Sequence, residues 1–300
     1  MGRAPSEVTV RDARVSPGDD GYPLHLRSLS DSPPLYVRGA LLREDALAVA
    51  IVGSRRASPY GLGVAEDLAR DLAARGVTIV SGLARGIDTA AHRGALAAGG
   101  RTLAVLGCGL DRAYPPENRA LAGEIAARGA VLSQFPPGTP PLARHFPARN
   151  RIIAGLTLGT VVVEAAESSG ALITAGLAGD LGRLVCAVPG RTTSPLSRGT
   201  NGLIRDGATL VRDWMDVVNE LPAVWRDCVH AVDDAMTAPP VMQPGDERIL
   251  LDLLGEEPLP IDRLIAASQL GAGRTSAALV GLEVSGWVRQ VPGQRYVRAR

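Results

Sequence analysis

The sequence contains no lysine, so all 32 of its basic side chains are arginines. Its formal net charge is only +1, which excludes the broad positive field of proteins that attract polyanions over their whole surface. Any polyanion must therefore be held by a local cluster of arginines, whose planar guanidinium groups hold phosphate with two hydrogen bonds and stack on bases. We attribute the missing lysines themselves to a composition bias of the genome.

Cysteine is also scarce, and long apolar runs are missing. Cys108, Cys186 and Cys228 lie too far apart for a metal motif or a disulfide framework, so we expect core thiols in a reducing compartment. No apolar run reaches the length of a membrane span, and the amino terminus is too polar and acidic for a signal peptide. The sequence therefore predicts a soluble, cytoplasmic protein with no membrane contact, no metal and no cofactor.

Length and local composition divide the chain into four parts. Three hundred residues exceed the usual size of one domain, which favours one large and one small domain. Residues 1–20 mix charge, glycine and proline without periodicity and are predicted to be a disordered arm. Residues 21–221 form the large domain, residues 222–246 with their clustered prolines form a linker, and residues 247–300 form the small domain.

The pattern of residues 247–300 predicts three short helices and a hairpin, which is typical of a winged-helix domain. Such a domain can place its third helix in a DNA groove, here with Arg274, Thr275 and Ser276 near the start of that helix. The third helix is otherwise mostly apolar. We therefore favour a module that binds protein, or touches DNA only loosely.

Short apolar runs alternate with helical patterns through the large domain. The runs lie at residues 47–52, 78–81, 102–106, 130–133, 160–163 and 184–188. This alternation predicts an α/β fold with a doubly wound, Rossmann-like parallel sheet that is covered by helices on both faces. In such sheets ligands bind beyond the carboxyl ends of the strands, so the residues that follow each strand are the candidate site.

The first apolar run, Leu47 to Val52, is followed by Gly53-Ser54-Arg55 and by a helix predicted to begin near Gly61. A turn of small residues between a buried strand and a helix can offer backbone N–H groups and the helix dipole to an anion. Arg55 adds a guanidinium that can hold a phosphate with two hydrogen bonds. The alternative is an ordinary strand-to-helix turn with solvated arginines.

A second concentration of charge lies at residues 144–151, which contain three arginines, one histidine and one phenylalanine. Arg149 and Arg151 are predicted near the start of a helix, where the dipole disfavours cations, and a bound phosphate backbone would reverse the sign of that interaction. Phe146 or Tyr114 could stack on bases, which is worth about 1–3 kcal/mol per base in single-strand sites.

We expect Arg55, Arg149 and Arg151 to converge at one rim of the parallel sheet. The alternative is that the arginines of this region form structural ion pairs with nearby carboxylates, of which the candidates are Glu164, Glu167 and Asp88.

Six short motifs in one order along the chain closely resemble the DNA-processing protein A family, called DprA or Smf. They are Gly53-Ser54-Arg55, Ser81-Gly82 through Asp88, Gly107-Cys108-Gly109 with Tyr114-Pro115 and Asn118, Phe146-Pro147 with Arg149 to Ile153, Ser169-Gly170 through Ala175, and Gly199 through Ile204. The preceding segments around Tyr22-Pro23 and from Pro33 to Gly39 fit the same family, so the resemblance covers nearly the whole chain.

The resemblance implies a cytoplasmic, non-enzymatic protein with an extended Rossmann fold that binds single-stranded DNA in a basic pocket. Members of the family protect incoming DNA and load the RecA recombinase onto it during natural transformation, and they form homodimers through the last part of the Rossmann domain. The resemblance thus names RecA as a partner, with single-strand-binding protein as a further candidate.

Site residues follow from the resemblance motif by motif. The implied DNA-binding residues are Gly53, Ser54, Arg55, Arg56, Gly82, Arg85, Arg144, Phe146, Arg149, Asn150, Arg151, Ser169, Gly170 and Thr174. The implied dimer interface contains Asn201, Leu203, Ile204, Leu210 and Val211. Two departures from the family stand out: Ala143 replaces a common lysine, so Arg144 would have to substitute for it, and no helical domain precedes Tyr22, so that this branch lacks it or the start is trimmed.

Three other functions are alternatives to DNA binding. A nucleotide phosphoribohydrolase-like enzyme would need a second glycine and a glutamate after Pro189-Gly190, and neither follows. A dinucleotide enzyme would need a Gly-x-Gly-x-x-Gly run after the first strand and an acidic residue where Ser81 stands. A protein-interaction scaffold with a vestigial pocket would keep its DNA binding, if any, when Arg55 or Arg149 is replaced by alanine.

Overall fold

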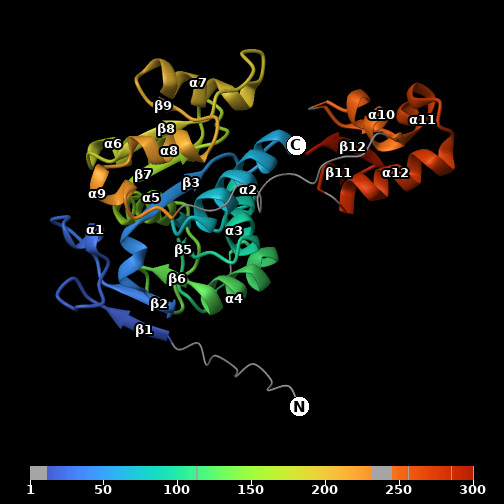
Figure 1. Ribbon diagram of the computed structural model, residues 1–300. Coiled ribbons are helices and arrows are strands. Elements are labelled where there is room, and N and C mark those ends of the chain that lie inside the picture. Colours follow the sequence, from blue (N-terminus) through green and yellow to red (C-terminus); the bar gives the residue numbers. More distant parts are fainter. Residues whose placement is uncertain (1–11, 113, 231–244, 256, 285, 300) are drawn as a thin grey trace. The chain divides into compact units, whose positions relative to one another are not determined.

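The computed structural model describes residues 12–112, 114–230, 245–255, 257–284 and 286–299 (Figure 1). The described residues fall into two compact units. The large unit lies within residues 1–57 and 64–232, and the small unit lies within residues 58–63 and 233–300.

The large unit contains a nine-stranded sheet in the part of the chain that is described. Its order is β1-β2-β6-β5-β4-β3-β7-β8-β9, and the strands from β6 to β9 are parallel. The strands are β1 Asp12–Val15, β2 Leu35–Gly39, β3 Ala48–Val52, β4 Thr78–Ser81, β5 Thr102–Leu106, β6 Ala130–Ser133, β7 Gly159–Val162, β8 Leu184–Ala187 and β9 Thr209–Leu210. The predicted doubly wound α/β fold is thus confirmed, with each predicted strand displaced by at most one residue at either end.

Helices cover both faces of this sheet. They are α1 Leu24–Arg27, α2 Pro59–Ala74, α3 Ile87–Ala97, α4 Arg119–Arg128, α5 His145–Leu156, α6 Gly170–Asp180, α7 Arg198–Arg205, α8 Trp214–Glu220 and α9 Ala223–Arg226, with 3-10 turns at Arg43–Ala46, Pro116–Asn118 and Pro195–Ser197. Figure 1 shows α3 and α4 on one side of the sheet and α5 and α6 on the other.

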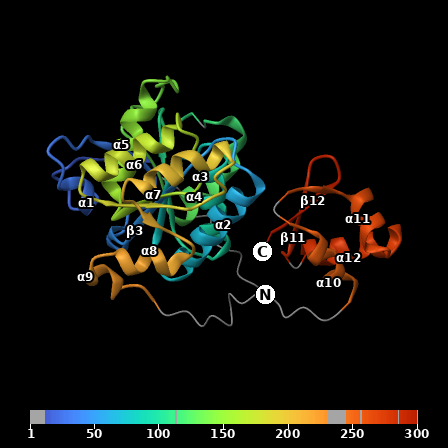
Figure 2. The same ribbon diagram turned by 90° about the horizontal axis from the view of Figure 1, so that it is seen from above.

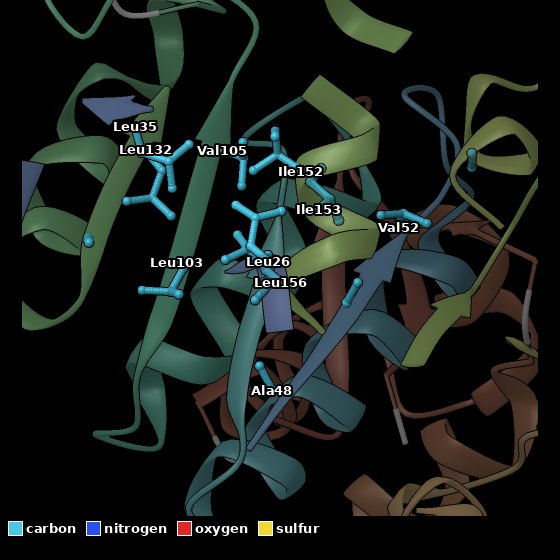
Figure 3. Packing of buried hydrophobic residues seen from close by; sticks show 14 of the residues in the cluster. Leu26, Leu35, Ala48, Val52, Leu103, Val105, Leu132, Ile152, Ile153 and Leu156 are labelled. Atoms are coloured by element: carbon cyan, nitrogen blue, oxygen red, sulfur yellow. The ribbon is translucent and has the colours of Figure 1, made fainter. Parts of the chain in front are cut away.

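The core follows the alternation of side chains along each buried strand. Leu103 and Val105 of β5 pack with Ile152 and Leu156 of α5, as Figure 3 shows. The residues between and after them, Ala104 and Leu106, pack on the opposite face, with Ile125 of α4. Because helices cover both faces of these parallel strands, the residues that point to either face can be apolar. This explains why the strands appear in the sequence as unbroken apolar runs.

The prediction of a disordered arm is wrong for residues 12–15, which form β1. This strand pairs antiparallel with β2, and the Arg38 guanidinium donates two 2.7 Å hydrogen bonds to the Asp12 carboxylate. These bonds lower the pKa of Asp12. The strand depends on a partner 26 residues away, which local composition does not reveal. Residues 1–11 lie outside the described residues.

The predicted linker also begins later than expected. Within residues 222–246, α9 forms a short helix, Trp225 packs edge-on against His25 at 5.4 Å between ring centroids, and the His230 amide donates to the Arg75 carbonyl. Cys228 lies in this stretch and is exposed, so the expectation of a core thiol is correct only for Cys108 and Cys186. Residues 231–244 lie outside the described part of the chain.

The small unit has the predicted winged-helix architecture. Its elements are α10 Asp246–Leu253, β10 Leu259–Pro260, α11 Ile261–Ser268, α12 Ala272–Val284, β11 Val288–Val291 and β12 Arg295–Arg298, and its sheet has the order β10-β12-β11. Figure 2 shows the three helices of this unit with β11 and β12. Leu250, Leu264 and Leu279, one from each helix, are buried together in its core. Arg274, the one basic residue of α12, forms an ion pair with Asp246, which leaves this helix poorly equipped to enter a DNA groove.

Candidate functional site

A cavity of about 660 Å³ lies at the carboxyl ends of β3 and β7. These two strands are neighbours, but the chain continues from β3 through β4, β5 and β6 on one side and from β7 through β8 and β9 on the other. Loops that leave such strands diverge, and a crevice opens between them at the point where the strand order reverses. The cavity is lined by the loops after β3 and β7 and by the first turns of α5 and α6.

The turn after β3 is packed closely against its neighbours. A Cβ at Gly53 would lie 2.6 Å from Cγ1 of Ile87, and a Cβ at Gly86, whose φ is +75°, would lie 2.2 Å from the Ser54 carbonyl oxygen. The Ser54 amide donates to the Glu164 carbonyl at 2.7 Å, and the Arg56 amide donates to the Ser54 hydroxyl. These two amides are therefore engaged within the protein, and the anion-binding capacity of the turn rests more on its arginines than we expected.

Two arginines lie against Phe146 at the wall of the cavity. The Arg55 guanidinium carbon is 5.1 Å from the centroid of the Phe146 ring, and that of Arg149 is 5.7 Å away. At these distances the negative face of the ring attracts both cations. Arg56 and Asn150 complete the polar wall, and Asn150 donates to the Gly170 carbonyl at 3.4 Å.

Arg149 is 4% exposed and belongs to a buried polar cluster with Asp88. Its Nη1 donates to the Val105 carbonyl at 3.1 Å and lies 4.0 Å from Oδ2 of Asp88. The Asp88 carboxylate also accepts hydrogen bonds from the amides of Gly82 and Ala84. A structural ion pair with Asp88, the alternative that the sequence left open, is therefore what the structure contains at Arg149.

Burial opposes both charges of this pair. Burial raises the pKa of Asp88, and the nearby Arg149 guanidinium opposes this rise. Burial also lowers the pKa of Arg149, and the Asp88 carboxylate opposes that decrease. Each group is stable in its charged form because the other is present, so the loss of either leaves a buried charge without its partner.

The remaining predicted DNA-binding residues divide into two groups. Ser169, Gly170 and Thr174 line the cavity at the start of α6, where the Ser169 hydroxyl caps the helix by accepting from the Ala171 amide. Arg144 and Arg151 do not line it. Arg151 instead forms a 2.6 Å ion pair with Asp31. The predicted convergence of Arg151 with Arg55 and Arg149 is therefore wrong, because a carboxylate 120 residues away in the chain binds its guanidinium.

Gly82 and Arg85 lie beside the main cavity, in a smaller depression that they share with Arg55 and Arg149. Arg85 forms an ion pair with Glu117. Gly82 is glycine for a steric reason: a Cβ there would lie 1.3 Å from Nη1 of Arg149.

The structure also adds a cavity residue that the sequence did not reveal. Ile173 lines the cavity and is 49% exposed. Helix α6 is apolar around its whole circumference, so no periodicity in the sequence distinguishes Ile173 from the buried residues of that helix.

The predicted dimer residues differ in how far they can reach a partner. Leu210 is 42% exposed and Ile204 is half-buried, whereas Val211 is 1% exposed and lies in the core. The Asn201 side chain bonds both the amide and the carbonyl of Gly190 in the same chain. Leu203 packs against the main hydrophobic cluster. The dimer remains a prediction, and Val211 is not available to it as a surface side chain.

Neither a metal centre nor a membrane span is found where the structure describes the chain. No group of three or more His, Cys, Asp or Glu side chains among these described residues could hold a metal ion. Over the same ranges, none of the helices combines the length and the apolar character that crossing a bilayer requires.

Comparison with known proteins links both units to one family. The family model described as DNA recombination-mediator protein A matches residues 13–222, and the one described as DprA winged helix domain matches residues 234–294. Protein Smf of Escherichia coli (strain K12) is 40% identical over 284 residues, which cover 93% of this chain and 75% of that protein.

Two solved structures resemble the chain in sequence and in fold. DNA processing protein A (DprA) from Streptococcus pneumoniae has a TM-score of 0.66 and 46% identity, covering 70% of this chain and 74% of that one. DNA processing protein A from Helicobacter pylori, a structure concerned with its single-stranded DNA binding mode, has a TM-score of 0.62 and 31% identity, covering 70% of this chain and 95% of that one.

Proposed function

Because this chain belongs to the DprA/Smf family, we propose that it is a DNA-processing protein that binds single-stranded DNA in the cavity at β3 and β7. In this proposal it works in the cytoplasm without catalysing a reaction, protects incoming DNA, and delivers it to the RecA recombinase during natural transformation. The nature of the ligand is supported by the Helicobacter pylori relative, whose structure concerns single-stranded DNA binding.

The observation that carries the proposal is the placement of Arg55 against the Phe146 ring, with Arg56 lining the same cavity. Among the described residues, neither arginine has a carboxylate within ion-pair distance, so both are available to an external anion. Hydroxyl and amide groups of Ser169, Thr174 and Asn150 line the same cavity. Cations for phosphates and a ring for a base thus occur together, as single-strand sites require.

Single strands fit this arrangement better than duplex DNA. The Phe146 ring can gain stacking energy only from a base whose face is open, and in a duplex each face is already covered by its neighbours. A flexible single strand can also bring its phosphate to Arg55 while its base reaches the cavity wall. Specificity for single strands therefore follows from stacking, whereas the affinity depends on the arginines and falls with salt.

A hydrolytic role has less support from the same geometry. The buried carboxylate of Asp88 already faces Arg149 and accepts two amide hydrogen bonds, so it is not poised to activate water. We expect no release of base from nucleoside monophosphates, and measurable release would favour the phosphoribohydrolase-like alternative.

Homodimer formation is part of the proposal. Among the predicted dimer residues, Leu210 of β9 is exposed, and Leu203 and Ile204 of α7 are half-buried, so these are the apolar side chains that a partner could reach. Light scattering with and without an oligonucleotide tests this part, and a mass that stays at one chain at all concentrations would contradict it.

The DNA-binding proposal is tested by a gel-shift titration of the chain against single-stranded and duplex oligonucleotides of the same sequence at several salt concentrations. We expect preference for the single strand and a log affinity that falls against log salt with a slope of about 0.7 per phosphate neutralised. Arg55→Glu should weaken binding by about 10- to 100-fold, since it removes charge-assisted hydrogen bonds and adds a repelling charge.

Arg93→Glu is the matched control, because Arg93 is exposed on α3 and does not line the cavity. The proposal fails if the two variants lose the same affinity, or if the wild-type chain shows no salt dependence. An Arg55→Ala variant with undiminished binding would instead support a scaffold whose cavity no longer holds DNA.

A further inference from the structure

A second large cavity lies at the opposite edge of the sheet from the proposed DNA-binding cavity. It has a volume of about 580 Å³, which is within the usual range for small-molecule sites. Side chains from residues 20–27 and 41–46 line it, together with Leu103 near the amino end of β5, Leu156 at the end of α5, and Trp225 of α9. None of these residues lines the DNA-binding cavity, so the two cavities are separate sites.

The deep part of this cavity is apolar and held in place. Leu103 and Leu156 are 1% and 3% exposed and belong to the main hydrophobic cluster. The Trp225 ring packs edge-on against the ring of His25, and Nε2 of His25 donates to the Ala46 carbonyl at 2.7 Å. A wall that is already fixed loses little conformational entropy when a ligand packs against it.

The mouth of the cavity exposes two large apolar side chains. Leu24 is 58% exposed and Leu42 is 47% exposed, and both line the cavity. Solvent-exposed apolar surface around a cavity is typical of a site that a ligand covers. A ligand with an apolar body would therefore remove both leucines from water.

The charged side chains of the lining favour an anion. The Asp45 carboxylate accepts hydrogen bonds from Nε and Nη2 of Arg101, both at 2.9 Å, so its charge is compensated within the protein. Arg27 and Arg43 also line the cavity, and in the described parts of the chain neither has a carboxylate within ion-pair distance. Asp20 is the remaining charged residue of the lining. Two guanidinium groups thus face one uncompensated carboxylate.

We propose that this cavity binds an amphipathic carboxylate, a molecule with an apolar tail and a single anionic head. The tail packs on Leu103 and Leu156, and the carboxylate stays at the mouth with Arg43. A neutral hydrocarbon would leave the guanidinium groups unused. A nucleotide would place polar atoms against leucines, which offer them no hydrogen bonds. The proposal does not depend on DNA binding, because the two sites share no residue.

The first test uses 10-bromodecanoate as the probe, because bromine quenches tryptophan fluorescence only at short range. Titration of the full chain should give saturable quenching, since the brominated tail lies beside Trp225. Trp225→Phe should remove the saturable part. Quenching that is unchanged in this variant would place the probe elsewhere and overturn the proposal.

A competition series with hexanoate, octanoate and decanoate then tests the apolar part of the site. Each added methylene group should tighten binding by about three- to fourfold until the cavity is filled, because each one leaves water for an apolar surroundings. An affinity that does not rise with tail length would refute the site.

The anionic part is tested by comparison of decanoate with decanol, which has the same tail and no charge. Arg43→Gln should weaken decanoate by about two- to fivefold, as expected for a solvent-exposed ion pair, and should leave decanol unchanged. Arg119→Gln is the matched control, because Arg119 is exposed at the start of α4 and does not line the cavity.

A further variant keeps the test independent of any folding defect at Trp225. Leu42 is exposed, so Leu42→Asp should leave the fold intact while it adds a negative charge at the mouth. It should weaken decanoate more than decanol. If Arg43→Gln behaves like its control, if Leu42→Asp affects both ligands equally, or if the wild-type chain shows no saturable quenching, the proposal fails. The proposed DNA-binding function would stand in each of these cases.

Discussion

A single methyl group at position 82 is expected to expel Arg149 from its buried site. A Cβ at Gly82 would lie 1.3 Å from Nη1 and 2.3 Å from Cζ of Arg149, so the two groups cannot occupy their positions together. The backbone at Gly82 does not itself require glycine, because its φ is not positive. The effect of Gly82→Ala should therefore come from the clash alone.

The magnitude follows from the ion pair that the clash breaks. Displacement of Arg149 leaves the Asp88 carboxylate buried without its cation, and the loss of one partner of a buried pair costs about 3–5 kcal/mol. When Arg149→Ala has already emptied the space, the methyl group meets no guanidinium and should cost about 1 kcal/mol or less. The double variant should then be about as stable as Arg149→Ala alone, and far from the sum of the two single effects.

Urea unfolding, followed by circular dichroism for the wild type, the two single variants and the double variant, measures these free energies of unfolding. The reasoning would be refuted if Gly82→Ala cost the same in both backgrounds, because the clash with Arg149 would then not be its cause. It would also be refuted if Gly82→Ala cost under about 1 kcal/mol in the wild-type background.

Two further predictions concern titratable groups. Burial lowers the pKa of His92 from 6.5 to about 3; between these values the unfolded chain binds a proton that the folded chain does not, so stability falls as the pH falls. This difference in pKa should lower the free energy of unfolding by about 2 kcal/mol between pH 7 and pH 5. In urea unfolding, His92→Gln should reduce the dependence of that free energy on pH. A variant with the same pH dependence as the wild type would contradict this prediction. Burial also raises the pKa of Cys186 to about 12, while Cys228 is exposed. Under native conditions a thiol reagent should label Cys228 first, as peptide mapping would show, and equal labelling of Cys186 would show that the core opens readily.

Much of the large unit could be predicted because parallel strands that are buried on both faces have a simple sequence signature. The apolar runs between residues 47 and 188 coincide with β3 to β8 to within one residue at either end. The position of the cavity also followed from the sequence, because a doubly wound sheet places its ligand site where the strand order reverses. Arg55 and Phe146 line the cavity for this reason.

Side-chain pairing could not be predicted in the same way, because it depends on residues that are distant in the chain. Arg149 and Arg151 stand two positions apart and have the same charge, yet one is buried beside Asp88 and the other is bound by Asp31. The choice of partner depends on which carboxylate the fold brings within reach of each guanidinium. The strand at residues 12–15 could not be predicted for the same reason, because it forms by pairing with β2, which is distant in the chain.

The sequence by itself determined the fold class, the order of the elements and the edge of the sheet where the site lies, because local apolar patterns and chain connectivity are enough for these. Only the tertiary structure decided which arginines face the cavity, that Gly82 must leave room for Arg149, and that Tyr114 lies next to Phe146. The physical reason is the separation of the interacting residues along the chain. An apolar pattern specifies a helix or strand within one segment, whereas ion pairs, ring contacts and steric clashes form between distant segments that folding brings together.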